Sequence, residues 1–598
     1  MIDIIEKEKI ELVDLLWSSE EKIMGILASA DDVDQAREEV LDHLNLLERS
    51  HYGLTNDDRL HVIERRNAET CIGVLKNIIR RESEKFTGFS ALNLLIKIAK
   101  DEERVLEDVA EGFLCEFIIL FKGIHGETGI CSENIKFSSD NEKDPLIRSE
   151  ELDCYAESIR NHIKDFNVGT EQSEIERRSK TKKKIMEYFD ATERDWNDYH
   201  WHLRHLIKDI DTISSLVTLE EDECDGLSMA ENHKIPFQIT PYYLSLFNLE
   251  GRNSLDRTVR AQVIPTTTYC KNMVKSSEEG IDMDFMQEKS MRPHDGITRR
   301  YPMIVIVKPF KACPQICIYC QRNWEIKKDD ESRSNKDQME HAIEWIEKNH
   351  NIVEVLVTGG DPLMLNNMSL DRTLSKISDI DHVERIRIGT RIPVTLPFRI
   401  DDELIRILSK YHELGKREIC VVVHFEHTSE ITWDVVDAIK KIKSLGINVY
   451  NQHVFTYYNS FRYETSALRI ALKRCGIDPY YNFNMKGKQE TIDFRVPIAR
   501  IEQERKEEAR FLPGLVRTDE TVFNVPKLGK SHLRSAQDHE VIMVLGTGER
   551  VYRFYPWESR VALVDDYLYT DVSIYDYLSR LKNDGVDLKE YGTIWYYY

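Results

Sequence analysis

The sequence predicts an α/β protein, a partial (β/α)6 barrel preceded by an all-α N-terminal domain. From Met303 onward, short apolar runs rich in valine and isoleucine alternate with helical stretches, which indicates parallel strands joined by helical crossovers. Before about residue 130, apolar residues recur at helical spacing, as in Leu41-Leu44-Leu47. Six strand–helix units favour an open version of the eight-fold barrel, whose active site lies at the carboxyl ends of its strands.

The strands and helices follow each other in a regular order. The predicted strands are Met303–Val307, Val353–Val357, Val383–Ile388, Ile419–His424, Asn448–Phe455 and Tyr480–Asn484. The predicted helices between them are Lys336–Lys348, Asp371–Ser378, Asp401–Tyr411, Trp433–Leu445 and Tyr463–Cys475. Residues that directly follow a strand are therefore the first candidates for function.

The chain is too long for one ordinary domain, since it has 598 residues. Near its end, a glycine-containing turn between Val541–Leu545 and Arg550–Tyr555 predicts a β-hairpin. The N-terminal helices contain no ligand cluster, and we leave open whether they bind a protein partner or form a homo-oligomer. We divide the chain into a helical N-terminal domain (1–131), a polar linker with a charged connector helix (132–190), a helical lead-in (191–298), the partial barrel (299–490) and a C-terminal region (491–598).

The composition excludes several classes of partner. Lys and Arg number 82 and Asp and Glu 105, so the net charge is −23, which argues against nucleic acid as a partner. No apolar stretch is long enough to span a bilayer, so we expect no membrane partner. The 11 cysteines are mostly scattered, as in a reducing compartment, and predict a cytoplasmic enzyme.

Three cysteines carry most of the chemical information. Cys313, Cys317 and Cys320 are spaced C-x3-C-x2-C on the loop that leaves the first predicted strand. Three thiolates can hold three irons of a 4Fe–4S cluster and leave the fourth iron open to S-adenosylmethionine (SAM). A partial zinc site or chance burial is the alternative, but the paired cysteines or the Cys/His complement of a zinc site are missing. The spacing resembles the cluster motif of the radical SAM enzymes.

A second motif, Thr358-Gly359-Gly360-Asp361, ends the next predicted strand. Glycines there let the backbone approach a ligand closely, although a glycine pair after a strand is often only a turn. In radical SAM enzymes such a segment meets the amino group of SAM. By this resemblance, Gly359, Gly360 and Asp361 are candidate SAM-binding residues.

Several further blocks resemble lysine 2,3-aminomutase and its relatives, in order, from about Asp195 to about Lys530. The blocks are Ile239 to Leu246, Ile264-Pro265-Thr266, Arg300-Tyr301-Pro302, Arg387-Ile388-Gly389-Thr390-Arg391, Leu396-Pro397, His424-Phe425-Glu426-His427, Asn451-Gln452 and Asp478-Pro479-Tyr480-Tyr481. The resemblance implies an isomerase that uses a 4Fe–4S cluster, SAM and pyridoxal phosphate (PLP) to move an amino group from the α to the β carbon. It also implies that Gln452 and His424 line the SAM and PLP cavity, although His424 could equally be a core histidine.

The resemblance also assigns a PLP site. Lys530, after Gly529, matches the lysine that binds PLP, with Lys527 as the alternative, and Arg300 and Tyr301 belong to the segment that helps to hold PLP. The chain departs from the family here, because the glycine run before the lysine has mostly gone. One arginine of the family's Arg-Tyr-Pro-Asp-Arg segment is also missing.

The substrate is predicted from three positions. Arg322 matches the arginine that grips the substrate carboxylate, with a structural salt bridge as the alternative. Lys486 and Asn524 stand where lysine-specific members carry two aspartates, and glutamate-specific aminomutases resemble this chain in that pair. A pocket with a cation favours an acidic substrate, unless the loop is shifted and Lys486 points to solvent.

These observations predict a radical SAM, PLP-dependent 2,3-aminomutase that converts glutamate to β-glutamate. Family resemblance also implies a reductant such as flavodoxin or ferredoxin. The alternatives are an aminomutase acting on arginine, lysine or protein-bound lysine, and a radical SAM enzyme without PLP. An iron–sulfur electron-transfer or scaffold protein is the third, but it would need neither the glycine motif nor the lysine loop.

Overall fold

The computed structural model describes most of the chain. The described residues are 2–51, 60–102, 104–130, 145–254, 256–326, 336–485, 489–533, 538–557 and 566–598. They form two compact units: unit 1 comprises 1–162, 496–508 and 531–598, and unit 2 comprises 163–495 and 509–530. The segment 491–598, which the sequence analysis treats as one region, is thus divided between both units. Within the described ranges, no helix is long and apolar enough to cross a membrane.

Unit 2 is built on a sheet whose strand order follows the sequence. Strands β2 to β8 run parallel to one another, and β1 pairs antiparallel with β2. The strands are β1 (Ile297–Thr298), β2 (Ile304–Phe310), β3 (Glu354–Gly359), β4 (Arg385–Gly389), β5 (Glu418–Val423), β6 (Asn448–Phe455), β7 (Asp478–Asn484), β8 (Glu520–Asn524) and β9 (Lys530–His532), which starts at the last residue of unit 2. All six predicted strands are present as β2 to β7, so the predicted parallel α/β sheet is confirmed.

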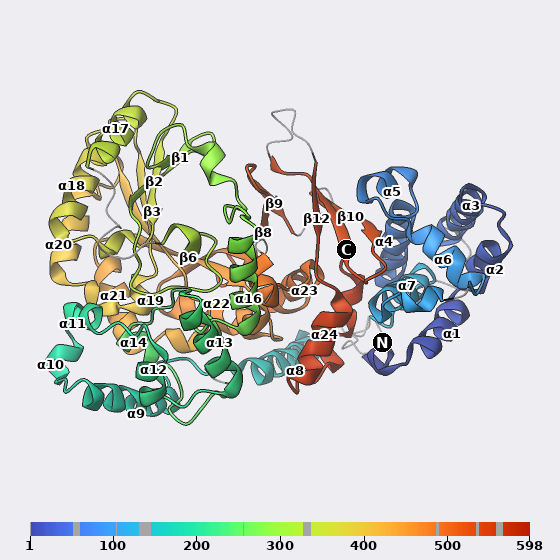
Figure 1. Ribbon diagram of the computed structural model, residues 1–598, viewed down its shortest axis with the longest axis horizontal. Helices are drawn as coiled ribbons and strands as arrows, with labels where there is room; N and C mark the ends of the chain where they lie inside the picture. The colour runs from blue at the N-terminus through green and yellow to red at the C-terminus, as the bar shows by residue number, and fades with distance from the viewer. Residues whose placement is uncertain are drawn as a thin grey trace. The chain divides into compact units, whose positions relative to one another are not determined.

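Helices connect consecutive strands and cover the sheet along its outer side (Figure 1). These are α17 (Lys336–Glu347), α18 (Asn367–Ser378), α19 (Ile392–Thr395), α20 (Asp402–Tyr411), α21 (Trp433–Lys443) and α22 (Glu464–Arg474). In α20, the Asp401 side chain caps the first turn by accepting a hydrogen bond from the Leu404 N–H at 2.8 Å. Leu404, Ile407 and Leu408 are buried on one face of the same helix.

The core of unit 2 explains why its strands read as apolar runs. Val355 and Val357 of β3, and Ile386 and Ile388 of β4, are fully buried. Parallel strands covered by helices bury their side chains thoroughly, and β-branched residues suit that environment. The polar groups of the sheet are therefore concentrated where the strands end.

The residues that lead into the sheet form helices. The connector carries α9 (Gln172–Tyr188), and the lead-in carries α10 (Glu193–Trp196), α11 (Tyr199–Arg204), α12 (Ile210–Leu216), α13 (Glu221–Asn232), α14 (Pro241–Leu244), α15 (Arg257–Ala261) and α16 (Thr267–Glu278). The residue after α15 is tied to the cysteine loop, because the Ile318 N–H donates to the Gln262 carbonyl at 2.9 Å. The lead-in thus supports the loop that carries the cluster motif.

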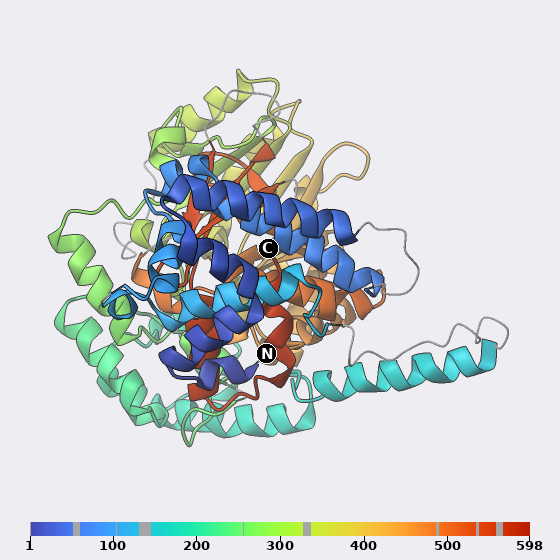
Figure 2. The same ribbon diagram turned by 90° about the vertical axis from the view of Figure 1, so that its right-hand side faces the viewer.

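Unit 1 combines the N-terminal helices with strands from the end of the chain (Figure 2). Its N-terminal helices are α1 (Lys9–Ser19), α2 (Glu21–Ser29), α3 (Val33–His51), α4 (Val62–Ile78), α5 (Arg81–Thr87), α6 (Ala91–Ala99) and α7 (Glu111–Ile124), and α8 (Pro145–Ile163) ends at the boundary with unit 2. Its later elements are α23 (Ile498–Gln503), β10 (His539–Val544), β11 (Arg550–Phe554), β12 (Tyr567–Thr570) and α24 (Ile574–Asn583). Strands β10 and β11 pair antiparallel, so the predicted hairpin is confirmed.

Candidate active site

The carboxyl ends of β2 to β8 surround a cavity of about 260 Å³. All three cysteines of the motif line it. The predicted residues that line it with them are Gly359, Gly360, Asp361, Arg322, His424, Gln452 and Asn524. The structure therefore brings together the predicted cluster, SAM and carboxylate residues, which come from segments more than 200 positions apart in the sequence.

The cysteine loop is held by hydrogen bonds on two sides. The Gln238 side chain donates to the Cys313 carbonyl at 2.9 Å, and the Ile316 N–H donates to the Gln238 carbonyl at 3.0 Å. On the other side, the Asp361 N–H donates to the Ala312 carbonyl at 2.9 Å. These contacts fix the path of the loop independently of any bound group.

Gly359 and Gly360 allow this close approach of two backbones. Gly359 has φ +123°, which side chains rarely tolerate. A Cβ atom on Gly360 would lie 2.3 Å from the Ala312 carbonyl oxygen, so only glycine fits against the residue that precedes Cys313. The glycine motif thus acts at least in part on the cysteine loop itself.

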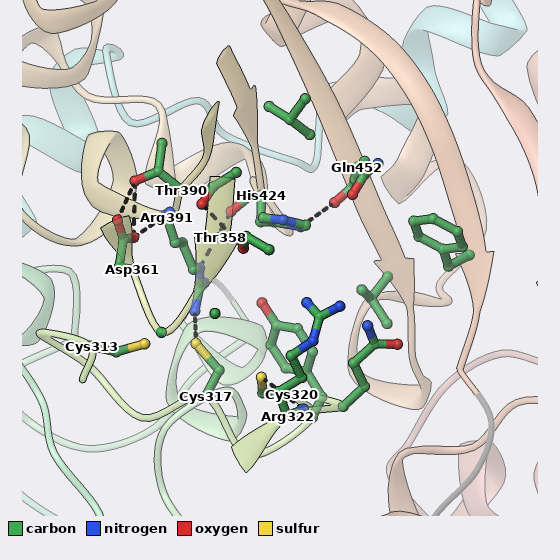
Figure 3. Close-up of a pocket in the computed structure, with 18 of the residues that line it drawn as sticks. Cys313, Cys317, Cys320, Arg322, Thr358, Asp361, Thr390, Arg391, His424 and Gln452 are labelled. Carbon is green, nitrogen blue, oxygen red and sulfur yellow. Dashed lines mark hydrogen bonds between the residues drawn. The ribbon is translucent and has the colours of Figure 1, made fainter. Parts of the chain in front are cut away.

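The Asp361 carboxylate braces the loop after β4 (Figure 3). The Thr390 hydroxyl donates to both of its oxygens, at 2.7 and 2.9 Å, and the Arg391 N–H donates at 2.7 Å. Burial raises the pKa of Asp361 to about 6, against the hydrogen bonds from Thr390 and the backbone, which lower it. Asp361 was predicted to bind SAM and lines the cavity, but both of its carboxylate oxygens accept hydrogen bonds from the protein.

His424 and Gln452 contact each other at the ends of β5 and β6. His424 Nδ1 lies 3.0 Å from the Gln452 carbonyl, which can only accept, so Nδ1 carries the proton and Nε2 is left as an acceptor. Burial lowers the pKa of His424 to about 4, so the ring is neutral at pH 7. Both residues line the cavity, where this neutral ring can accept a hydrogen bond from a ligand.

Arg322 pairs with a carboxylate that sequence reasoning missed. Its Nη2 lies 2.8 Å from Glu288, and Lys308 Nζ lies 2.6 Å from the same carboxylate. Glu325 accepts from Lys308 at 2.8 Å and extends the network. Burial disfavours the charge of Glu288, but Arg322 and Lys308 outweigh it and lower its pKa to about 2. The salt bridge considered as the alternative role for Arg322 is therefore present, while the residue still lines the cavity.

The predicted PLP residues contact one another. Lys530 Nζ donates to the Tyr301 hydroxyl at 2.6 Å, and burial lowers the pKa of Lys530. Arg300 donates to the carbonyls of Leu528 at 2.7 Å and Gly529 at 3.1 Å, so it holds the lysine loop in place. The alternative, Lys527, is exposed. None of Lys530, Tyr301 and Arg300 is among the described residues that line the cavity.

Neutral amides occupy the ends of β7 and β8. Asn524 lines the cavity, and its Oδ1 is buried without a hydrogen-bond partner among the described residues. Asn484, which the sequence analysis gave no role, lines the cavity with 4% exposure, and neither of its side-chain polar atoms has such a partner. Lys486 lies outside the described residues.

Two further residues of the site were missed. Arg391 belongs to a block quoted for its resemblance but was given no role, and its Nη1 lies 2.8 Å from Cys317 Sγ (Figure 3). Glu430 accepts from Arg391 Nη2 at 2.9 Å. The position of Arg391 after the third predicted strand, inside that block, was the signal in the sequence for it, whereas Glu430 lies in no recognised motif.

The cysteine loop and its surroundings fit a 4Fe–4S cluster. Thiolates are the ligands that such clusters prefer, and three of them line one cavity beside a glycine wall. In the part of the chain that the structure describes, no three His, Cys, Asp or Glu side chains lie close enough to bind a single metal ion.

Comparison with known proteins assigns the class. Residues 307–465 match the radical SAM superfamily, and they contain the cysteine loop, Gly359, Gly360, Asp361 and Arg391. The fold and the site therefore define a radical SAM enzyme, with a 4Fe–4S cluster and SAM as its cofactors.

Full-length similarity assigns the family. An uncharacterized KamA family protein of Methanocaldococcus jannaschii is 38% identical over 98% of this chain and 97% of its own length. The chain belongs to the KamA family. Glutamate 2,3-aminomutase of Clostridioides difficile is 33% identical over 59% of this chain and 80% of its own length. L-lysine 2,3-aminomutase of Methanococcus maripaludis is 34% identical over 53% of this chain and 70% of its own length. The predicted family and the enzyme class, a radical SAM isomerase of aminomutase type, are confirmed.

Proposed function

We propose that the chain is a SAM- and PLP-dependent 2,3-aminomutase that converts an acidic amino acid, most simply glutamate to β-glutamate. One observation carries the proposal: a single cavity has the three cysteines on one wall and the neutral amides of Asn484 and Asn524 on another. Radical formation and side-chain recognition can therefore take place in one cavity.

Arg322 supports the binding of an α-carboxylate. Nε and Nη2 contact Glu288, but Nη1 has no hydrogen-bond partner among the described residues. A guanidinium held on one side by a buried carboxylate presents its remaining nitrogen in a fixed direction. Nη1 is thus available to a substrate carboxylate without breaking the pair with Glu288.

The amides support a substrate without a side-chain cation. Asn524 stands where the resemblance places an aspartate in lysine-specific relatives, so a negative charge that would attract an ammonium is missing. Amide N–H groups can donate to a side-chain carboxylate, and Lys486 follows Asn484 by two residues. The proposed preference for glutamate rests on the replacement of the two aspartates of lysine-specific relatives by Lys486 and Asn524.

Lys530 supports the use of PLP. When bound, PLP supplies the carbonyl to which the substrate nitrogen attaches. Lys530 is 8% exposed, and burial lowers its pKa, which increases the fraction of neutral amine able to attack that carbonyl. Tyr301 receives a hydrogen bond from Lys530 Nζ, and Arg300 fixes the loop through its carbonyls.

The radical side of the cavity supports SAM. The cluster and SAM supply the hydrogen-abstracting group, and a one-electron reductant such as flavodoxin or ferredoxin supplies the electron. In this chain, Gly359 and Gly360 let the backbone after β3 pack closely against the cysteine loop. His424 offers a neutral hydrogen-bond acceptor at Nε2. The protein contributes orientation and the exclusion of water.

The test is an anaerobic assay of the reconstituted protein. The protein with its cluster, PLP, SAM and dithionite is incubated separately with glutamate, lysine and arginine, and β-amino acids and 5′-deoxyadenosine are measured by chromatography with mass detection. We expect β-glutamate and no β-lysine. Cys317→Ala is the control that should abolish both products, and Asn524→Asp should reduce β-glutamate.

Each other outcome selects an alternative. β-Lysine or β-arginine would replace the proposed substrate but keep the reaction. Deoxyadenosine without any β-amino acid, with no PLP bound, would favour a radical SAM enzyme without PLP or one acting on protein-bound lysine. No consumption of SAM by the fully loaded protein would contradict an enzyme and favour an electron carrier.

A further inference from the structure

Arg391 donates a hydrogen bond directly to a cysteine of the cluster motif. It follows β4 and precedes α19, is 8% exposed, and places Nη1 2.8 Å from Cys317 Sγ. Among the described residues, no other side-chain cation donates a hydrogen bond to a motif cysteine. Arg322, the next cation along the cavity, approaches Cys320 only with its backbone N–H, at 3.4 Å, while its guanidinium pairs with Glu288.

The guanidinium of Arg391 is held from every side. Nη2 donates to Glu430 Oε1 at 2.9 Å and also to Oε1 of the Gln262 side chain. Nε donates to the backbone carbonyl of His424 at 3.3 Å. Glu430 is fully buried. A planar group with all three nitrogens engaged cannot turn away from Cys317 without breaking several buried contacts.

Reduction makes this contact stronger. The cluster takes up one electron, no bond breaks and no proton is needed, so the negative charge of the cluster with its thiolates grows by one unit. A fixed cation whose N–H donates to a ligand sulfur stabilises the more negative form, and it does so strongly because the site is buried. Hydrogen bonds to the sulfurs and net charge are known determinants of cluster potentials.

We propose that Arg391 is a positioning residue that raises the reduction potential of the cluster through its contact with Cys317. Arg391 thereby brings the cluster within reach of a weaker reductant before SAM is cleaved. The proposal concerns the cluster alone, so it holds whatever the amino-acid substrate is and whether or not PLP is bound.

The test is a redox titration of the reconstituted full-length protein, without SAM or amino acid, followed by the electron paramagnetic resonance signal of the reduced cluster. Dithionite with mediators supplies the electrons. The variants are Arg391→Gln, which removes the charge and the fork, and Arg391→Lys, which keeps the charge. Arg387→Gln is the matched control, because Arg387 lines the same cavity but pairs with Glu354 rather than a cysteine.

At a fixed potential, we expect Arg391→Gln to lower the ratio of reduced to oxidised cluster at least tenfold. For a one-electron couple, a tenfold change in this ratio corresponds to a shift of 59 mV in the reduction potential. Arg391→Lys should shift the potential less, and Arg387→Gln much less than Arg391→Gln. Iron and sulfide content must match wild type for each variant compared.

Three results would overturn the proposal. An unchanged potential in fully loaded Arg391→Gln would show that the contact does not tune the cluster. An equal shift in Arg387→Gln would assign the effect to overall charge. Failure of both Arg391 variants to retain the cluster, with wild-type circular dichroism, would make Arg391 an assembly residue instead.

Discussion

The carboxylate of Glu116 and the guanidinium of Arg550 form a bidentate ion pair inside unit 1, although 434 positions separate them in the chain. The two N–O distances are each 2.9 Å, and the residues are 0% and 2% exposed. Arg550 also donates to the carbonyls of Trp595 and Tyr597, each at 2.6 Å. The pair thus joins α7 to β11 and to the end of the chain.

Glu116→Ala should destabilise unit 1 by about 3 to 5 kcal/mol, because it leaves the buried charge of Arg550 without its partner. Urea unfolding followed by circular dichroism measures the loss. Glu6→Ala breaks the exposed pair between Glu6 and Lys582 and is the control, for which we expect no measurable change. Equal stability of Glu116→Ala and wild type would contradict a structural role of the pair.

Gly360→Ala should disturb the cysteine loop. The added Cβ would meet the Ala312 carbonyl oxygen at 2.3 Å, and backbone must move to relieve that contact, which costs about 1 to 3 kcal/mol in packed sites. We expect a lower melting temperature and less iron bound per chain after reconstitution. Gly514→Ala, where a Cβ would meet nothing within 4 Å, should leave both quantities unchanged. Full iron loading of Gly360→Ala would refute the close-packing argument.

Lys530→Ala should abolish covalent attachment of PLP, whereas Lys527→Ala should leave it intact. Lys530 is buried with a lowered pKa, and Lys527 is exposed. Reduction of the PLP-loaded protein with borohydride, followed by peptide mass spectrometry, locates the modified lysine. Modification at Lys527, or none in wild type, would reject the assignment.

His453 should make stability depend on pH. Its Nδ1 lies 2.9 Å from Asn482 Oδ1 and its Nε2 3.0 Å from Asn459 Nδ2, so both amides hold the neutral ring. Burial lowers the pKa of His453 to about 4. The unfolded chain binds the proton more readily, so this contribution to stability is full above pH 6.5 and is lost as the pH falls towards 4.

The variant His453→Gln removes this titration. Between pH 7.5 and pH 5, its unfolding free energy should fall by about 2 kcal/mol less than that of wild type. Urea unfolding at the two pH values gives the comparison, and the same replacement at the exposed His233 is the control. An identical fall in His453→Gln and wild type would show that His453 does not titrate in this window.

The sequence was most informative where local pattern determines structure. The apolar run behind the predicted strand Ile419–His424 can be recognised because a strand buried on both faces needs consecutive β-branched residues, and the observed strand is Glu418–Val423. Cys313, Cys317 and Cys320 were recognised because one loop carries the whole ligand set. Their meeting with Gly360 followed from the rule that functional residues gather at the carboxyl ends of parallel strands.

Contacts between distant residues were not predictable in this way. Arg322 meets Glu288 across 34 positions and Arg391 meets Glu430 across 39, and nothing in the local sequence marks either carboxylate as a partner. The short strand Glu520–Asn524 was also missed, since it is too short and mixed to give a clear pattern. Such features depend on tertiary packing, and the periodicity of apolar residues along a single sequence does not reveal tertiary contacts.

Because unit 1 takes its last strands from beyond residue 530, its folding is tied to the timing of protein synthesis. A ribosome adding about 5 to 20 residues per second needs roughly 20 to 90 s to travel from Glu116 to Arg550. During that interval α7, whose Phe113, Phe117 and Phe121 are fully buried in the finished unit, is made without its C-terminal partners. The nascent chain therefore carries an apolar helix that stays without part of its packing while nearly all of unit 2 is being synthesised.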